Sequence, residues 1–226
     1  MSNYYESYPR FLVSVDCIIF GFSEGKLKLL IQQRQLEPGK GLWSLMGGFV
    51  KKEESVSQAA SRVLFELTGL HKIYMEQLGA YGDVERDPGE RVVSVAYYAL
   101  INVNEYDSEL SKEHFAKWVD VDELPELCFD HNEMVRNARK AMKDRIKVEP
   151  IGYNLLPEHF TLTQLQSLYE SIMGESIDKR NFRRSILDKD YLIKTDLIDK
   201  KNSRRGAVLY KYNDKHGQNN QSEQEN

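Results

Sequence analysis

A glycine-containing loop that runs directly into an amphipathic helix constrains the fold of this chain more than any other segment. The loop reads Trp-Ser-Leu-Met-Gly-Gly-Phe-Val over residues 43–50. Beyond it, apolar residues recur at helical spacing until Gly69 ends the pattern. Together with a helix that opens at Asp130, the surrounding β-branched and aromatic runs predict a mixed α/β domain. The predicted strands cover residues 11–22, 27–33, 73–81, 91–103 and 116–121.

The composition is that of an ordinary globular protein. Of 226 residues, 41% are hydrophobic and 29% are charged, which excludes collagenous, disordered and disulfide-scaffold chains. No apolar run approaches the roughly 18 residues of a membrane span, and residues 1–10 do not form a basic-then-apolar leader. We therefore expect a cytoplasmic protein with no membrane contact. Cys17 and Cys128 each stand alone among apolar residues, which predicts buried thiols and neither a metal site nor a disulfide.

The pattern of the chain changes after a short connecting segment. Residues 148–157 hold two prolines and a glycine, which break a helix and fit a linker. Residues 161–173 then place apolar side chains on one helical face. Thr161 and Gln164 stand at capping-box spacing, and Gly174 is positioned as the stop. These signals predict an amphipathic helix that opens a second domain.

Two further elements complete this second domain. A short basic helix begins after Asp178, and residues 191–212 predict two strands around a polar loop. Helix, turn, helix and hairpin form the outline of a winged helix-turn-helix. We therefore predict an α/β domain over residues 1–150, a winged helix over 151–216 and a disordered tail over 217–226.

Charge is distributed unevenly along the chain, although the net charge is only −4. Residues 1–157 carry 24 acidic and 19 basic side chains, whereas residues 158–216 carry 9 acidic and 12 basic ones. A basic segment on an acidic body favours contact with a polyanion at that end. A solvated charged surface is the alternative that charge alone leaves open.

The short basic helix has the organisation of a DNA recognition helix. On a helical wheel Phe182 and Ile186 point into a core, whereas Arg180, Asn181 and Arg184 point away from it. Arginine and asparagine can contact guanine and adenine edges in the major groove, and cations at the wing can neutralise phosphate. The residues predicted to contact DNA are Lys179, Arg180, Asn181, Arg183, Arg184, Lys200, Lys201, Arg204 and Arg205.

The glycine loop and the helix after it resemble the Nudix box, G-x5-E-x7-R-E-U-x-E-E-x-G-U with U aliphatic. Of the nine diagnostic positions seven match, and these are Gly48, Glu54, Arg62, Leu64, Glu66, Gly69 and Leu70. Residues 75–100 and 128–131 look like the ADP-ribose-type branch of the Nudix family. The resemblance implies the Nudix α/β/α sandwich with a mixed sheet.

The two positions that differ from the box are the chemical ones. In active Nudix hydrolases three glutamates hold Mg²⁺ or Mn²⁺ against a diphosphate, and the matching residues here are Val63, Glu66 and Leu67. One carboxylate is too few for a metal that must offset phosphate charge and activate water. We therefore expect no enzymatic activity, no catalytic residue, no metal and no cofactor. Arg62 and Glu66, together with Glu54, predict an ion-pair network that braces the loop. An active Nudix hydrolase is the alternative from another class.

From residue 11 to residue 212 the chain resembles the Nudix-related transcriptional regulators, most closely over residues 178–184. The resemblance implies a homodimer that binds palindromic operator DNA, and a Nudix-like domain that senses a small molecule. Two effectors are known in this group: ADP-ribose in a branch that controls NAD metabolism, and L-arabinose in a sugar-catabolism branch. We expect L-arabinose, with ADP-ribose as the alternative, because the sequence most closely resembles the arabinose branch. The missing carboxylates support this expectation in part, since they remove the metal that would neutralise a diphosphate. A module that only binds a protein partner is a third alternative.

Nudix substrates lie beside the box helix and the neighbouring strands, so the resemblance implies that the effector binds there. Polar groups and an aromatic face in these segments suit a sugar. The residues predicted to bind the ligand are Asp16, Trp43, Glu66, Asp83, Glu85 and Arg91. Each has an alternative role as a surface pair or a core residue.

Overall fold

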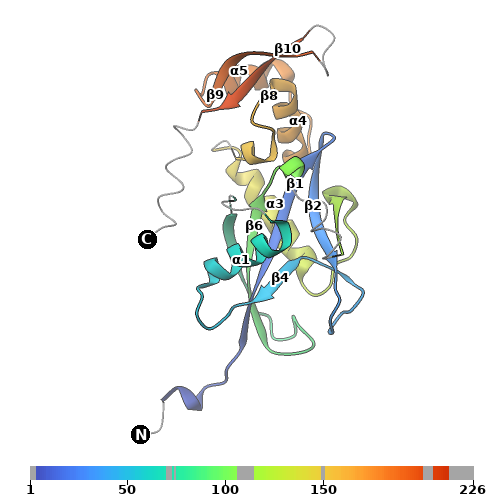
Figure 1. Ribbon diagram of the computed structural model, residues 1–226, viewed down its shortest axis with the longest axis vertical. Helices are drawn as coiled ribbons and strands as arrows, with labels where there is room; N and C mark the ends of the chain where they lie inside the picture. The colour runs from blue at the N-terminus through green and yellow to red at the C-terminus, as the bar shows by residue number, and fades with distance from the viewer. Residues whose placement is uncertain are drawn as a thin grey trace. The chain divides into compact units, whose positions relative to one another are not determined.

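The computed structural model describes residues 4–69, 73, 75–105, 115–148, 151–200 and 206–213. The chain divides into two compact units, and Figure 1 shows the elements of each. The first unit takes its described residues from 1–21, 28–101 and 105–141, and the second takes them from 22–27, 102–104 and 142–226. Within the described residues, no helix has the length and apolar composition that crossing a bilayer requires.

The first unit is built on a seven-stranded mixed sheet. Its strands are β1 (Leu12–Ser23), β2 (Lys26–Gln33), β3 (Trp43–Ser44), β4 (Met46–Phe49), β5 (Met75–Tyr81), β6 (Val92–Leu100) and β7 (Ala116–Asp120). The order is β3-β2-β1-β6-β5, with β4 paired to β1 and β7 paired to β2. β1 runs parallel to β6 and antiparallel to β4, so the predicted mixed sheet is confirmed.

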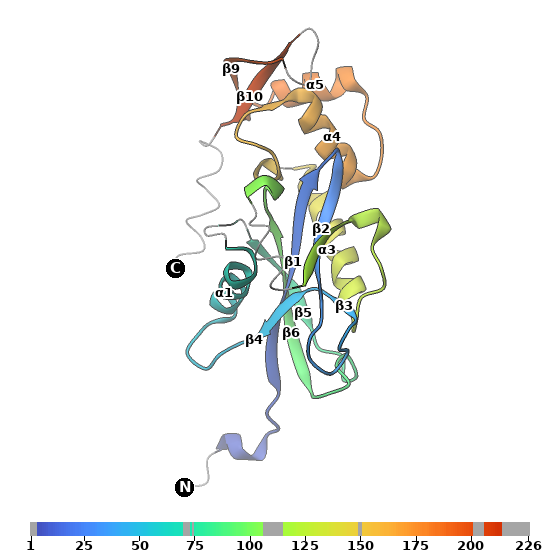
Figure 2. The ribbon, with the colours of Figure 1, turned by 45° about the vertical axis from the view of Figure 1, so that its right-hand side comes forward.

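Two helices cover this sheet. Figure 2 shows α1 (Val56–Thr68) and α3 (His131–Arg145) on opposite sides of it. Successive side chains of β1 point to opposite faces of the sheet. On one face Val15, Cys17 and Ile19 pack in the core cluster that includes α1. Because both faces are covered, β1 is buried without interruption from residue 15 to residue 21, which explains its nearly continuous apolar sequence. Asp16 is the one charged residue in this buried stretch.

Local signals fix the ends of α1. Ser55 and Gln58 form a reciprocal capping box at its start. At its end Gly69 adopts φ 70°, in the left-handed region that favours glycine. Short 3-10 turns occur elsewhere as η1 (Tyr4–Ser7), η2 (Val103–Glu105), η3 (Val121–Glu123) and η4 (Tyr153–Leu155).

The second unit is a winged helix, as predicted. It contains β8 (Phe160–Thr161), α4 (Leu162–Met173), α5 (Lys179–Leu187), β9 (Leu192–Asp199) and β10 (Ala207–Tyr212). The strands form an antiparallel sheet in the order β8-β10-β9. The predicted capping box of Thr161 and Gln164 and the left-handed stop at Gly174 are both present at the ends of α4. The predicted tail, residues 217–226, lies outside the described residues.

Candidate functional site

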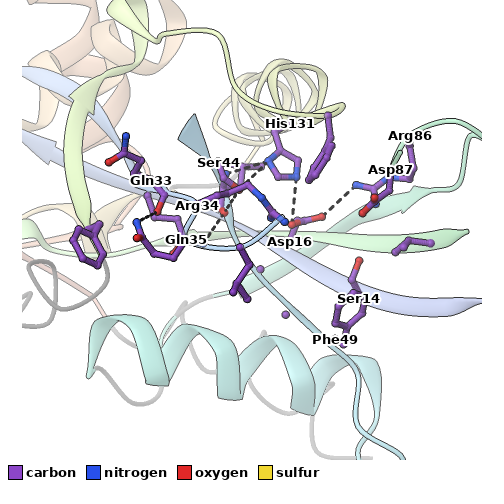
Figure 3. Close-up of a pocket in the computed structure, with 18 residues that line it drawn as sticks. Ser14, Asp16, Gln33, Arg34, Gln35, Ser44, Phe49, Arg86, Asp87 and His131 are labelled. Carbon is purple, nitrogen blue, oxygen red and sulfur yellow. Dashed lines mark hydrogen bonds and ion pairs between the residues drawn. The ribbon is translucent and has the colours of Figure 1, made fainter. Parts of the chain in front are cut away.

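A cavity of about 430 Å³ opens in the first unit, and Figure 3 shows its lining. β1, β2 and β4 contribute residues to it, as do the segments before β6 and at the start of α3. The lining residues are Ser14, Asp16, Gln32, Gln33, Arg34, Gln35, Leu36, Ser44, Leu45, Gly47, Gly48, Phe49, Arg86, Asp87, Val92, Phe115, Phe129 and His131. Polar groups, two arginines and three phenylalanine rings therefore share one pocket.

Asp16 lies at the centre of this pocket, and its position depends on a glycine. Its partner across the β1–β4 pairing is Gly47. A Cβ atom at position 47 would lie 2.5 Å from Asp16 Oδ1 and 3.0 Å from the carbonyl oxygen of Val15. Glycine therefore lets the β4 backbone approach the buried carboxylate closely.

A buried network surrounds the Asp16 carboxylate. Ser94 Oγ donates a hydrogen bond of 2.6 Å to Asp16 Oδ2, and Arg86 Nη2 lies 3.5 Å from the same oxygen. Arg86 also donates two hydrogen bonds of 2.8 Å to the two carboxylate oxygens of Asp130. This bidentate pair joins the segment before β6 to the start of α3, since Asp130 directly precedes that helix. A single buried arginine therefore contacts both carboxylates, and its charge offsets one of their two negative charges.

His131 completes the network as a neutral imidazole. Its Nδ1 accepts a hydrogen bond of 3.1 Å from the backbone amide of Leu45, so Nδ1 carries no proton. The proton is therefore on Nε2, which lies 3.5 Å from Asp16 Oδ1. Burial lowers the pKa of His131 below its usual value, against the opposing effect of Asp16 and Asp130. The imidazole thus holds the β3–β4 backbone and orients the Asp16 carboxylate.

Two phenylalanines whose backbones have positive φ angles form another part of the pocket. Phe115 and Phe129 have φ values of 51° and 58°, a region that residues other than glycine rarely adopt. The Arg34 guanidinium lies 4.9 Å from the centre of the Phe129 ring, and its Nε donates to the carbonyl of Pro38. Such strained residues persist where the surrounding structure fixes them, and they cluster at functional sites. The pocket therefore offers a cation and flat apolar faces to a ligand.

The box helix has the ion-pair network that the sequence predicts. Arg62 donates hydrogen bonds of 2.9 and 2.6 Å to Glu54, one of 3.1 Å to the Phe49 carbonyl and one of 3.2 Å to Glu66. Hydrogen bonds from Arg62 and from the Lys51 amide lower the pKa of Glu54 to about 2. These contacts tie the loop before α1 to the helix itself.

The box positions that lack glutamate are part of the core. Val63 is 2% exposed and Leu67 is 9% exposed, and both pack in the cluster that joins α1 to the sheet. Among the described residues, no group of three or more histidine, cysteine, aspartate or glutamate side chains is arranged to hold a metal ion.

The residues predicted to bind the ligand are only partly brought together. Asp16 lines the pocket, whereas Trp43, Glu66, Asp83, Glu85 and Arg91 are not among its lining residues. Instead, Lys117 Nζ lies 4.0 Å from the Trp43 ring centre, Glu66 pairs with Arg62, and Arg91 donates to the carbonyls of Gly82 and Asp83. Asp83 and Glu85 are exposed. Arg86 and His131 were not predicted to bind the ligand, although both lie in segments that resemble the ADP-ribose-type Nudix branch.

The recognition helix predicted in the second unit has the expected orientation. Phe182 and Ile186 are each 6% exposed, whereas the five predicted DNA-contacting residues of α5 are exposed: Lys179, Arg180, Asn181, Arg183 and Arg184. Asp178 caps the helix by accepting a hydrogen bond of 2.9 Å from the Asn181 amide. Lys200, at the end of β9, is also exposed. Lys201, Arg204 and Arg205 lie outside the described residues.

The fold and the two sites define a class of protein, the regulators that join a ligand-binding α/β domain to a winged helix. Residues 10–140 match the NUDIX domain family, and residues 152–212 match the NrtR DNA-binding winged helix domain. The chain belongs to the NrtR-type family of Nudix-related transcriptional regulators.

Three relatives illustrate this membership. The ADPR responsive transcriptional repressor NtrR of Acinetobacter baylyi is 34% identical over 217 residues, which cover 94% of this chain and 86% of that protein. The crystal structure of Shewanella oneidensis NrtR complexed with a 27mer DNA has a TM-score of 0.81 and 32% identity, and covers 89% of this chain and 93% of that one. The cocrystal structure of the NUDIX domain of that NrtR with ADP ribose has a TM-score of 0.50 and 29% identity, and covers 62% of this chain and 94% of that one.

These relatives do not support L-arabinose as the effector, which we expected from the sequence. The similar repressor is named for its response to ADPR, and the similar NUDIX domain was crystallised with ADP ribose. The expectation came from a resemblance to the arabinose branch, and its supporting argument assumed that only a metal on the box could offset a diphosphate. The pocket contains cations that do not come from the box, because Arg34 and Arg86 both line it.

Proposed function

We propose that this chain is a transcriptional repressor that binds operator DNA through the second unit and senses ADP-ribose through the pocket of the first. The observation that carries the proposal is α5, with its apolar stripe buried and its cations and Asn181 exposed. The similarity to a DNA complex over nearly the whole chain supports it. A regulator of this kind acts in the compartment that holds its DNA, in line with the predicted cytoplasmic location.

In this proposal α5 enters the major groove. Arg180 and Arg184 can each donate two hydrogen bonds to a guanine, and Asn181 can pair with an adenine edge. Lys179, Arg183 and Lys200 are placed to neutralise phosphates, which positions the helix without reading sequence. We propose the same phosphate role for the wing cations Lys201, Arg204 and Arg205.

Two recognition helices on a palindromic site require a homodimer, which we also propose. The half-sites of such an operator lie about one helical turn apart, roughly 34–36 Å. Sedimentation of the free chain should give twice the mass of one chain, and footprinting should give two symmetric protected segments. A monomer that protects a single segment would contradict this part of the proposal.

The pocket has groups that suit ADP-ribose. The Arg34 side chain supplies a cation that can meet a phosphate of the ligand. The rings of Phe49, Phe115 and Phe129 can pack against a base or a ribose. The other residues predicted from the sequence, such as Trp43 and Arg91, remain proposals that ligand titration of alanine variants can test.

We further propose that the first unit senses its nucleotide without hydrolysing it. Val63 and Leu67 are buried aliphatic residues where a metal site needs carboxylates. Incubation of the full chain with ADP-ribose and Mg²⁺ should yield no AMP above the uncatalysed background. Turnover at ordinary enzyme rates that is lost in Glu66→Gln would instead identify an active hydrolase.

The proposal as a whole is tested by two binding measurements. First, selection from a random duplex library with the full chain should enrich a palindromic sequence. Second, calorimetry should detect ADP-ribose binding to the full chain, and Asp16→Asn should weaken it, while L-arabinose should give no heat. Failure to enrich any duplex would overturn the DNA-binding part, and absence of heat with ADP-ribose would overturn the sensing part.

A further inference from the structure

The second unit contains a cavity of its own, separate from the pocket described above. It has a volume of about 310 Å³ and lies within the winged-helix unit. Its lining residues are Ile146, Lys147, Tyr169, Ile177, Asn181, Phe182, Ser185, Ile186, Lys189 and Tyr191. Sites for small ligands have volumes of about 300–1,000 Å³, so this cavity suits a compact molecule and not a dinucleotide.

Recognition helix α5 forms one wall of the cavity. Asn181 and Ser185 are spaced four residues apart, so they form one stripe along the helix, and Lys189 lies in the turn that follows the end of α5 at Leu187. This stripe runs beside the buried Phe182 and Ile186, whereas Arg180 and Arg184 lie on the opposite side of the helix. The cavity is therefore behind the surface that we expect to read DNA, with Asn181 at the border.

The cavity combines an apolar interior with polar groups. Phe182 and Ile186 are each 6% exposed, as is Ile146 on another segment. Tyr169 packs edge-on against Phe182, with ring centres 5.2 Å apart. Burial raises the pKa of the Tyr169 phenol, so the group stays protonated at neutral pH and can donate a hydrogen bond. An aromatic ring has a suitable environment here, next to groups that can donate hydrogen bonds.

The charges of the cavity have one sign. Lys147 and Lys189 line it, and the described residues that form the lining include no acidic side chain. Lys147 is partly neutralised by Asp144, at 3.2 Å. The second lysine, Lys189, lies 5.9 Å from the centre of the Tyr191 ring. This arrangement suits one negative charge on the ligand, since a diphosphate would carry more charge than the remaining cation can offset.

We propose that this cavity is a second ligand site, and that it binds a small aromatic carboxylate. The ring packs against the side chains of Tyr169, Phe182 and Ile177, and the carboxylate meets Lys189 at the opening, with Ser185 as a hydrogen-bond donor. The site does not depend on ADP-ribose, because every group that forms it belongs to the second unit, whereas we place that nucleotide in the first unit.

Saturation-transfer NMR of the full chain with benzoate tests this proposal. Benzoate should receive saturation from the protein, and Ser185→Phe should abolish the effect because the larger side chain fills the cavity. Ser185→Ala is the matched control for side-chain size: it leaves the cavity open and removes only the hydroxyl hydrogen bond, so benzoate should bind more weakly than to the wild type but still receive saturation. Lys189→Gln should weaken the benzoate affinity by about two- to fivefold, the range of a partly exposed ion pair.

Two further ligands distinguish this site from the pocket of the first unit and from binding through the aromatic ring alone. Benzyl alcohol has the same ring without the charge and should bind more weakly than benzoate. Saturating ADP-ribose should not displace benzoate, since we place that nucleotide in the first unit. Displacement by ADP-ribose, no transfer at all, or equal affinity for the neutral analogue would overturn the proposal.

The Ser185→Phe variant gives the sharpest outcome. Equal saturation transfer in the wild type and in Ser185→Phe, folded by circular dichroism, would also overturn the proposal. If Ser185→Phe does not fold, retention of full benzoate affinity in Lys189→Gln would overturn it instead.

Discussion

Gly47 brings the backbone of β4 into close contact with the Asp16 carboxylate in the pocket. In Gly47→Ala the new methyl group would lie 2.5 Å from Asp16 Oδ1, so the β4 strand or the carboxylate must move. We expect a loss of about 1–3 kcal/mol in the free energy of unfolding, as for other overpacked sites, together with weaker ADP-ribose binding. Urea unfolding followed by tryptophan fluorescence measures the first effect, because Trp43 and Trp118 both belong to the first unit.

A matched glycine controls for the loss of backbone freedom. Gly79 lies in β5, and a Cβ atom there would meet no heavy atom within 4 Å. Gly79→Ala should therefore leave both stability and ligand affinity nearly unchanged. Equal losses in Gly47→Ala and Gly79→Ala would show that contact with Asp16 is not the cause.

His131 makes the stability of the first unit depend on pH. Its folded-state pKa is lowered, so between that pKa and the unfolded value of about 6.5 the unfolded chain binds more protons. The free energy of unfolding therefore falls as pH drops below about 6.5, and this loss stops below the folded pKa. The charged groups around the imidazole are Asp16, Asp130, Arg86 and Arg34, of which the carboxylates oppose the shift and the arginines reinforce it.

The measurement is the urea midpoint of the first unit at pH 8 and pH 5.5. His131→Gln should be less stable at pH 8, because it disturbs the contact to the Leu45 amide, but its midpoint should change less between the two pH values. His159→Gln, in the second unit, should keep the wild-type pH dependence of the first. An unchanged pH dependence in His131→Gln would argue against a buried neutral imidazole.

Residues of the pocket were the hardest part to predict from sequence. Asp16 is predicted as a polar group on a strand beside the box helix, where the resemblance places the effector, and it does line the pocket. Its partners Arg86 and His131 are far away in the chain, and only the β1–β6 pairing and the placement of α3 bring them close. The predicted Arg91 is near Arg86 in the chain, but its guanidinium is held by the carbonyls of residues 82 and 83.

At the scale of elements, prediction from sequence works where local chemistry decides the structure. The capping box at Thr161, the stop at Gly174 and the N-cap at Asp178 each depend on groups within a few residues, and all three are present. Strand ends shift by a few residues from the predicted ranges, because they depend on the partner strand as well. The capping box of Ser55 and Gln58 has the same local origin, although we did not predict it.

For α5 we predict that residues contacting bases and residues contacting phosphates affect DNA binding differently. If Arg184 contacts a guanine through two hydrogen bonds, Arg184→Ala should weaken binding to the selected operator by about 1–3 kcal/mol and relax selectivity at one base pair per half-site. Non-specific binding should change less. Lys200→Ala should weaken all sequences similarly and reduce the steepness of the salt dependence by about one unit per contact.

The control is an exposed arginine in the other unit. Arg136 lies on α3, and Arg136→Ala removes the same charge without touching α5. It should leave operator affinity and its salt dependence unchanged. If the variants at Arg184 and Lys200 behave like the one at Arg136, the basic face of the second unit is a solvated surface.

For the whole molecule, the sequence predicted both units and the class of protein but not the effector. The missing carboxylates of the box argue against metal-dependent hydrolysis, but they do not identify the effector. The choice between a nucleotide and a sugar depends on side chains that come together from separate strands. The similar repressor and the similar NUDIX domain favour ADP-ribose over the sugar, and Arg34 and Arg86 line the pocket from outside the box. Only the folded arrangement shows that they share a pocket with Asp16.

The central claim is that one chain couples a nucleotide in the first unit to DNA on the second. The most direct test is the dissociation constant for the selected operator, measured by fluorescence anisotropy with and without saturating ADP-ribose. We predict a change of roughly 5- to 150-fold, and the same factor must appear in the ADP-ribose affinity of the free and operator-bound chain. Equal operator affinities in the presence and absence of ADP-ribose, with the nucleotide shown to be bound, would contradict the account.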